Sequence, residues 1–196
     1  SFARLLPIDM VGAQLTNDDG ITAPGIRNLV NFMNEIGDVV VVAPDSPQSG
    51  KGHAITINQT LTFEEISLDG PQKDYSLSGT PVDCVKFALD KILPRKPDLV
   101  VSGINHGANS SINVIYSGTM SAAVEAGVEG LQAIGFSLLD FSWDADFSQA
   151  KEYIQNIVKK VLENPLPKGV VLNVNIPKLS KDEIKAAIAT ISPELK

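Results

Sequence analysis

Two short runs of apolar, mostly β-branched residues constrain the fold of this chain most. Asp38–Ala43 reads DVVVVA, and Asp98–Ser102 reads DLVVS. Neither run alternates apolar and polar residues, so both faces of each strand are expected to be buried. Strands of this kind belong to parallel sheets that carry helices on both sides. The sequence therefore predicts a central parallel sheet.

Other segments of the chain carry helical or strand patterns around these two runs. Apolar residues at helical spacing predict helices over 24–36, 80–93, 116–130, 147–163 and 181–188. Further strands are expected over 10–16, 74–78, 133–137 and 169–176, with one or two extended segments over 54–63 and a loop over 64–73. Pro24 and Pro81 suit first helical turns, where a missing N–H removes no hydrogen bond.

Strands and helices alternate along most of the chain. This order predicts a three-layer α/β/α sandwich with a Rossmann-like, mostly parallel sheet and right-handed crossovers. The 196 residues suit a single domain over 1–196, and 43% apolar with 20% charged residues is ordinary for a soluble globular protein.

The charge and cysteine content narrow the functional classes. A net charge of −7 argues against binding of a nucleic-acid polymer or an anionic membrane. Residues 1–14 lack the uninterrupted apolar segment of a signal peptide, and no apolar run has the length of a membrane span, so a cytoplasmic location is expected. The single cysteine, Cys84, lies in an apolar helical pattern and is expected in the core.

Polar loops follow three of the expected strands, at 16–20, 44–53 and 102–111. Because the carboxyl ends of parallel strands share one edge of a sheet, these loops should converge there. The first contains Asn17-Asp18-Asp19-Gly20, which alone fits a surface turn as well as a cation site. Convergence of the loops favours the cation site.

Asp18, Asp19, Ser49 and Asn105 would form an all-oxygen pocket. Such a pocket suits Mg²⁺ or Mn²⁺, with Ca²⁺ as an alternative, and does not suit zinc or copper. Asp18 and Asp19 are also the candidate catalytic groups, as base or nucleophile. Direct attack by water is favoured because both acids are expected to serve the metal.

A hydroxyl-rich helix start at 117–121 should lie on the same edge and could bind a phosphate through its free N–H groups. Ordinary helix capping by Ser117, Thr119 and Ser121 is the alternative. The sequence contains neither G-x-G-x-x-G nor G-x-x-x-x-G-K-[ST], which weakens dinucleotide and P-loop interpretations. A phospho-receiver domain fits poorly because Asp45 follows Pro44, while a non-catalytic nucleotide-binding module remains a rival hypothesis.

Five ordered sequence blocks lie within about residues 15–138. They are Thr16–Gly20 (TNDDG); Ala43–Asp45 with Gln48–Gly50 and Gly52–His53; Ser78–Val85 (SGTPVDCV); Ser102–Asn105 with Gly107–Asn109; and Tyr116–Thr119 (YSGT). Together these blocks resemble the SurE (survival protein E) family of metal-dependent nucleoside monophosphate phosphatases. The resemblance implies hydrolysis of nucleoside 5′- and 3′-monophosphates, as in a 5′-nucleotidase or acid phosphatase, often with exopolyphosphatase activity. It also implies assembly as homodimers or homotetramers.

The resemblance also implies roles for individual residues. One divalent cation per subunit would be held by Asp18, Asp19, Ser49 and Asn105. Phosphate and substrate binding would involve Asn17, Asn105, Gly107, Asn109, Ser117, Gly118 and Thr119.

This sequence departs from the family pattern at three places. The first strand of the family is normally an apolar run close to the N-terminus, whereas Ser1–Gln14 is longer and less apolar here. His106 stands where the family usually carries arginine, a change expected to weaken substrate anchoring. Family members also continue well past Asn173–Pro177 into a hairpin used for oligomerisation, so that part is expected to be shortened here. A catalytically inactive metal- or nucleotide-binding domain is the alternative function.

Overall fold

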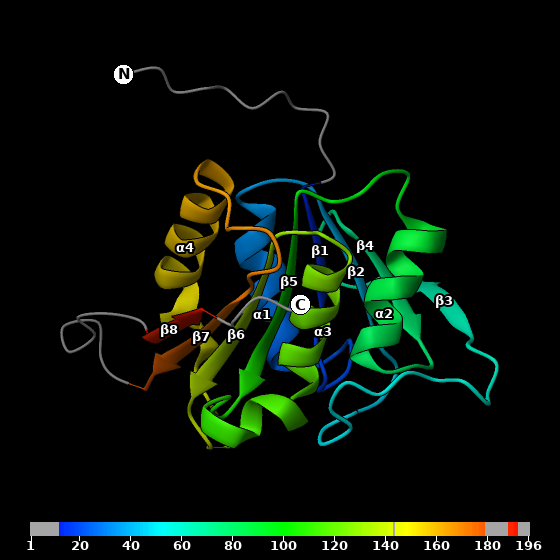
Figure 1. The fold of residues 1–196 in the computed structure, drawn as a ribbon, viewed down its shortest axis with the longest axis horizontal. Coiled ribbons are helices and arrows are strands. Elements are labelled where there is room, and N and C mark those ends of the chain that lie inside the picture. Colours follow the sequence, from blue (N-terminus) through cyan, green and yellow to red (C-terminus); the bar gives the residue numbers. More distant parts are fainter. Residues whose placement is uncertain (1–11, 143, 179–187, 192–196) are drawn as a thin grey trace.

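The computed structural model describes residues 12–142, 144–178 and 188–191, the last segment as backbone only. Within these residues eight strands form one sheet in the order β3-β4-β2-β1-β5-β6-β7-β8 (Figure 1). The strands are β1 (Ala13–Thr16), β2 (Val39–Pro44), β3 (Phe63–Ile66), β4 (Lys73–Leu77), β5 (Leu99–His106), β6 (Ala133–Leu139), β7 (Leu172–Pro177) and β8 (Ile188–Ile191).

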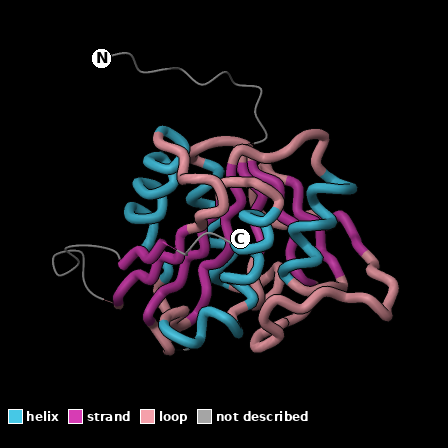
Figure 2. The backbone as a smooth tube through the Cα atoms, in the orientation of Figure 1, coloured by secondary structure: helices cyan, strands magenta, loops and turns pink. Residues whose placement is uncertain are grey.

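Helices cover both faces of this sheet, as the helices and strands of Figure 2 show. The α-helices are α1 (Pro24–Asn34), α2 (Pro81–Phe87), α3 (Gly118–Val128) and α4 (Lys151–Glu163). Helix α2 continues as a π-helical turn, η1 (Ala88–Ile92). Two 3₁₀ turns, η2 (Ser111–Tyr116) and η3 (Phe147–Ala150), precede α3 and α4. Helices α1 and α4 pack on one face of the sheet, and α2 and α3 pack on the other. The predicted three-layer sandwich is confirmed.

The six inner strands are mutually parallel, and the two edge strands, β3 and β8, run antiparallel. The central strand β1 lies between β2 and β5, with Leu15 fully buried. Burying such a side chain contributes about 1.5–3 kcal/mol. The run at 39–44 is buried apart from the partly exposed Val40, as its continuous apolar pattern predicts.

The edge strand β3 corrects one prediction. Residues 54–62 form no strand, and the segment expected as a loop over 64–73 begins inside β3. Phe63 packs against Phe87 with ring centroids 4.9 Å apart, while Glu64 and Glu65 are exposed. Charged residues on an edge strand discourage pairing with other chains. They also remove the apolar alternation by which a strand is recognised.

The second edge strand corrects another prediction. Ile188, expected to end a helix over 181–188, begins β8, which pairs antiparallel with β7 through Leu172 opposite Ile191. Two β-branched isoleucines and a threonine favour this extended backbone. Residues 181–187 of that expected helix, and residues 10–11 of the first expected strand, lie outside the described residues.

Two helix starts bring specific side chains to the carboxyl edge of the parallel strands. Thr80 and Asp83 form a reciprocal capping box at α2: Asp83 N donates to Thr80 Oγ1 at 3.1 Å, and Thr80 N donates to Asp83 Oδ2 at 2.9 Å. Ser117 caps α3 by accepting a 3.1 Å hydrogen bond from Met120 N. In the part of the chain that the structure describes, no helix has the length and apolar character needed to cross a membrane.

Candidate active site at the carboxyl edge of the sheet

Asp18 follows β1 directly and is buried against the start of α3. Thr119 Oγ1 donates a 2.6 Å hydrogen bond to Asp18 Oδ1, and the backbone amides of Gly118 and Thr119 also donate to this carboxylate. Burial nevertheless raises the pKa of Asp18. A Cβ placed on Gly118 would lie 2.6 Å from Asp18 Cβ, so this close approach requires glycine.

Asp19 is partly exposed beside Asp18. Burial, followed by the negative charge of Asp18, raises the pKa of Asp19 to about 6, while His106 acts in the opposite direction. Among the described residues, neither aspartate forms an ion pair with a basic side chain. The pair is therefore a concentrated, uncompensated negative charge.

The loop after β2 reaches this acid pair through its backbone. Gln48 N donates a 2.7 Å hydrogen bond to the backbone oxygen of Asp18. Ser49 is the next residue and is exposed, and no hydrogen bond joins its hydroxyl to either aspartate within the described residues. The predicted ligand Ser49 thus lies next to an anchored residue on the expected edge.

The loop after β5 begins beside the first loop because Thr16 pairs with Ser102. Asn105 lies at the end of β5, and its Nδ2 donates a 2.9 Å hydrogen bond to the backbone oxygen of Gly107. This bond orients the amide, whose carbonyl oxygen is the atom that could serve a cation. The loops carrying Asp18 and Asn105 therefore start from adjacent strands, as predicted.

Asn109 is held by two asparagines that sequence reasoning missed. Asn109 N donates to Asn175 Oδ1 at 2.9 Å, and Asn173 Nδ2 donates to the backbone oxygen of Asn109 at 2.7 Å. Asn173 and Asn175 are buried on β7. The available signal was their alternation in an otherwise apolar strand, because two polar residues on one buried face need partners.

The hydroxyls at the start of α3 all have partners within the protein. Ser117 Oγ accepts from Met120 N, Ser121 Oγ donates to the backbone oxygen of Ser117 at 2.6 Å, and Thr119 holds Asp18. The capping alternative is therefore correct for Ser117. A phosphate at this helix start remains a prediction, and it would compete with Asp18 for the same N–H groups.

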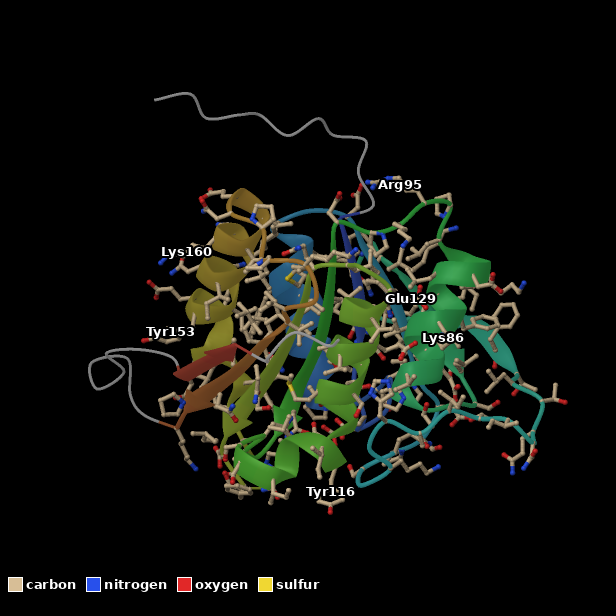
Figure 3. All side chains as sticks on the ribbon, in the orientation of Figure 1. Lys86, Arg95, Tyr116, Glu129, Tyr153 and Lys160 are labelled. Carbon is tan, nitrogen blue, oxygen red and sulfur yellow. The ribbon has the colours of Figure 1, made fainter. Side chains whose placement is uncertain are left out.

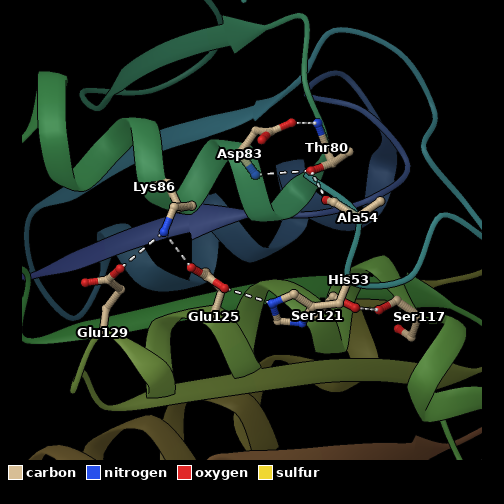
Figure 4. A network of polar contacts seen from close by, with 9 residues as sticks. All are labelled: His53, Ala54, Thr80, Asp83, Lys86, Ser117, Ser121, Glu125 and Glu129. Carbon is tan, nitrogen blue, oxygen red and sulfur yellow. Dashed lines mark hydrogen bonds and ion pairs between the residues drawn. The ribbon is translucent and has the colours of Figure 1, made fainter. Parts of the chain in front are cut away.

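His53 ties the end of the second loop to two helices (Figure 4). Its Nε2 lies 2.8 Å from Glu125 Oε2 on α3, and Lys86 Nζ on α2 lies 2.9 Å from Glu125 Oε1. Burial favours a higher pKa for Glu125, but the hydrogen bonds from His53 and Lys86 hold this pKa below its usual value. Thr80 Oγ1 also donates a 2.7 Å hydrogen bond to the backbone oxygen of Ala54.

Lys86 extends this network to Glu129, which lies 3.4 Å away (Figures 3 and 4). Through His53, the network holds the chain four residues after Ser49. Sequence reasoning assigned no role to His53, and its partner Glu125 lies 72 positions further along the chain.

His106 lies beside the acid pair. Its Nε2 lies 2.8 Å from the backbone oxygen of Ser142, and its backbone amide donates to Asp19. Its ring lies 6.2 Å from that of Phe147, measured between centroids. His106 thus links the acid pair to the turn that follows β6.

The residues at this edge match the chemistry of a hard divalent cation. The two carboxylates lack a counter-charge, and Asn17 Oδ1 is buried with no hydrogen-bond partner among the described residues. No three His, Cys, Asp or Glu side chains gather in the described chain, so amide and hydroxyl oxygens would have to complete the set. Such an oxygen-rich set suits Mg²⁺, Mn²⁺ or Ca²⁺.

Known proteins share this fold and sequence. The "Survival protein SurE" family model matches residues 13–194. The "5'-nucleotidase SurE" of Flavobacterium johnsoniae is 70% identical over 172 residues, covering 87% of this chain and 66% of the relative. The "5'-nucleotidase SurE" of Bacteroides fragilis is 48% identical over 171 residues, with coverage of 87% and 66%. The chain thus spans about two thirds of these curated relatives.

A solved structure extends the match to three dimensions. The crystal structure of the SurE protein from Aquifex aeolicus has a TM-score of 0.82 and 36% identity, covering 93% of this chain and 82% of that one. Sequence and fold agree with the resemblance drawn from the five sequence blocks. The chain belongs to the SurE family.

Proposed function

We propose that this chain contributes the active site of a divalent-metal-dependent phosphomonoesterase that hydrolyses nucleoside 5′-monophosphates to nucleoside and phosphate. The observation that carries the proposal is the Asp18–Asp19 pair at the N-terminus of α3, in which Asp18 is buried, Asp19 is partly exposed, and neither has a basic partner among the described residues. The name 5'-nucleotidase borne by relatives up to 70% identical supports the same activity.

We propose Asp18, Asp19, Ser49 and Asn105 as the residues that would hold the cation. A divalent cation bound there would polarise the phosphoryl oxygens and lower the pKa of a bound water. Mg²⁺ or Mn²⁺ fits the donor set, with Ca²⁺ as the alternative.

The two aspartates have different surroundings, which supports different roles for them. Asp18 is 4% exposed and accepts a hydrogen bond from Thr119, so its position is fixed. Asp19 is more exposed and is free of a comparable side-chain anchor in the described structure. Asp18 is therefore a poor nucleophile, and Asp19 is the better placed of the two to take a proton from an attacking water.

Substrate binding would use the loop at 105–109 together with the start of α3. Asn109 is rigid because Asn173 and Asn175 hold its backbone on both sides. Asn109 Nδ2 is buried with no hydrogen-bond partner in the described residues, so it is a donor that an anionic oxygen could use. Asn17, Gly107, Ser117, Gly118 and Thr119 complete the proposed substrate-binding set.

The broader proposal follows the family resemblance. It includes nucleoside 3′-monophosphates and polyphosphate as further substrates, a homodimer or homotetramer as the assembly, and the cytoplasm as the location. These properties are proposed for the whole protein, because the chain spans about two thirds of the length of its relatives.

A hydrolysis assay tests the proposed function. The protein is incubated with a panel of nucleoside monophosphates and Mg²⁺ or Mn²⁺, and released phosphate is measured with and without a chelator. The proposal expects activity that chelation abolishes and that Asp18→Asn lowers by at least about 100-fold. Activity that survives both changes would contradict it. Nucleotide binding by calorimetry without turnover would instead support the inactive binding domain.

A further inference from the structure

An aromatic ring stands in solvent at the same edge as the acid pair. Phe141 follows β6 by two residues, and 75% of its surface is exposed. An exposed phenylalanine forgoes most of the stabilisation that burial of its ring would give. Single exposed apolar residues are common, so its surroundings must decide whether it has a role.

The residues on both sides of Phe141 are firmly held. Asp140 is buried, and it accepts hydrogen bonds from Ser142 N at 2.9 Å and from Lys178 Nζ at 3.0 Å. The backbone oxygen of Ser142 is in turn 2.8 Å from His106 Nε2. The turn therefore presents Phe141 from a fixed backbone.

The Phe141 ring lies directly against the proposed substrate loop. A Cβ added to Gly107 would be 2.6 Å from Cε1 and 3.1 Å from Cδ1 of this ring, and the φ angle of Gly107 is +99°. Gly107 N also donates a 2.9 Å hydrogen bond to the backbone oxygen of Leu138. Glycine at this position lets the ring rest on the loop between Asn105 and Asn109.

We propose that Phe141 is the platform on which the substrate's nucleobase stacks. The inference rests on the proposed function, since it assigns the base end of a substrate whose phosphate would meet the acid pair. A flat aromatic surface attracts any base through its π-face and discriminates little among bases. The geometry thus points to a preference for nucleoside monophosphates over sugar phosphates that lack a base, with little discrimination among the bases.

The test compares substrates with and without a base in the full-length protein. Phe141→Ala is expected to raise KM for adenosine 5′-monophosphate about tenfold with little change in kcat. For ribose 5-phosphate, neither constant should change. Phe141→Trp should keep the low KM, because it restores an aromatic face. Val128→Ala is the matched control, since Val128 is 60% exposed at the opposite end of α3.

Equal KM values for adenosine 5′-monophosphate in wild type and Phe141→Ala would overturn the inference, as would an equal rise for ribose 5-phosphate. A change in the molecular mass of Phe141→Ala, measured by sedimentation, would also overturn the inference, because the ring would then lie in an interface between copies of the chain. If the wild-type protein hydrolyses nothing, calorimetry with adenosine decides. Weaker binding to Phe141→Ala supports the inference, and equal or absent binding in both proteins refutes it.

Discussion

Thr119 Oγ1 donates a 2.6 Å hydrogen bond to Asp18 Oδ1, and this contact joins the start of α3 to the end of β1 across 101 positions of sequence. A hydrogen bond to a buried carboxylate is charge-assisted and has a fixed geometry. Thr119 therefore orients the carboxylate that the proposed cation would meet.

Removing this hydroxyl should weaken metal binding. Thr119→Val keeps the volume and the β-branch but leaves Asp18 without its side-chain donor. We expect about tenfold weaker binding of Mn²⁺ by calorimetry and a loss of about 1.5–3 kcal/mol in the free energy of unfolding. Thr119→Ser is the control, because it keeps the hydroxyl. Unchanged Mn²⁺ affinity in Thr119→Val would show that Asp18 needs no such orientation.

Replacing Asp19 should make the metal-free protein more stable and at the same time remove its stabilisation by Mn²⁺. Its carboxylate is destabilised in the metal-free protein, as its pKa of about 6 indicates. Asp19→Asn removes the repulsion with Asp18. We therefore expect the metal-free variant to have a higher Tm at pH 7.5, with a free energy of unfolding raised by roughly 1 kcal/mol after solvent screening. Addition of Mn²⁺ should then raise the Tm of the wild type but leave the variant unchanged.

Asp69→Asn is the matched control for this prediction, since Asp69 is an exposed acid in a loop between β3 and β4. It should leave both the Tm and the response to Mn²⁺ as in the wild type. A metal-free Asp19→Asn variant less stable than wild type would contradict the uncompensated charge inferred for the pair.

Much of this site follows from strand order, and the rest depends on contacts that no local pattern encodes. The apolar runs at 38–43 and 98–102 predicted a parallel sheet, and a parallel sheet brings its carboxyl-edge loops together. The pairing of Thr16 with Ser102 confirms that the loops of Asp18 and Asn105 start side by side. Sheet topology thus predicts which loops lie next to each other, but it does not predict which side chains are in contact.

The contacts that were missed span long stretches of sequence. Asn109 is held by Asn175 over 66 positions, and His53 meets Glu125 over 72. Strand β3 was missed for a different reason. Its sequence is FEEI, both glutamates are exposed to solvent, and the strand is held by backbone pairing with β4. Patterns of burial cannot reveal a strand whose side chains are mostly exposed.

The Glu125 network should matter for stability in a pH-dependent way. The pKa of Glu125 is lowered in the folded protein, so its contribution is present above its unfolded pKa and is lost as pH falls through the folded one. Glu125→Gln should therefore lower the free energy of unfolding by roughly 1 kcal/mol at pH 7. The difference from wild type should vanish in acid, measured as urea midpoints from pH 7 to pH 3.

The same variant tests whether the network supports the Ser49 loop. His53 and Lys86 lose their shared carboxylate, while the hydrogen bonds from Thr80 to Ala54 and from Thr56 N to Asp83 remain. We expect faster amide hydrogen exchange over residues 49–53 in Glu125→Gln. Glu129→Gln, which loses only the 3.4 Å contact with Lys86, should exchange as the wild type does.

The turn that carries Phe141 supplies the last prediction. Hydrogen bonds from Ser142 and Lys178 lower the pKa of Asp140 to about 2 from its ordinary 3.8. Because this pKa is depressed, Asp140 stabilises the fold fully above about pH 4, and that contribution disappears as pH falls through about 2. Asp140→Asn should thus be less stable than wild type at pH 7 and should converge with it near pH 2 in thermal unfolding. If the turn presents Phe141 to the substrate, this variant should also raise KM for adenosine 5′-monophosphate, while KM for ribose 5-phosphate stays constant. A stability difference that persists at pH 2 would show that the effect of Asp140→Asn does not depend on the ionised carboxylate.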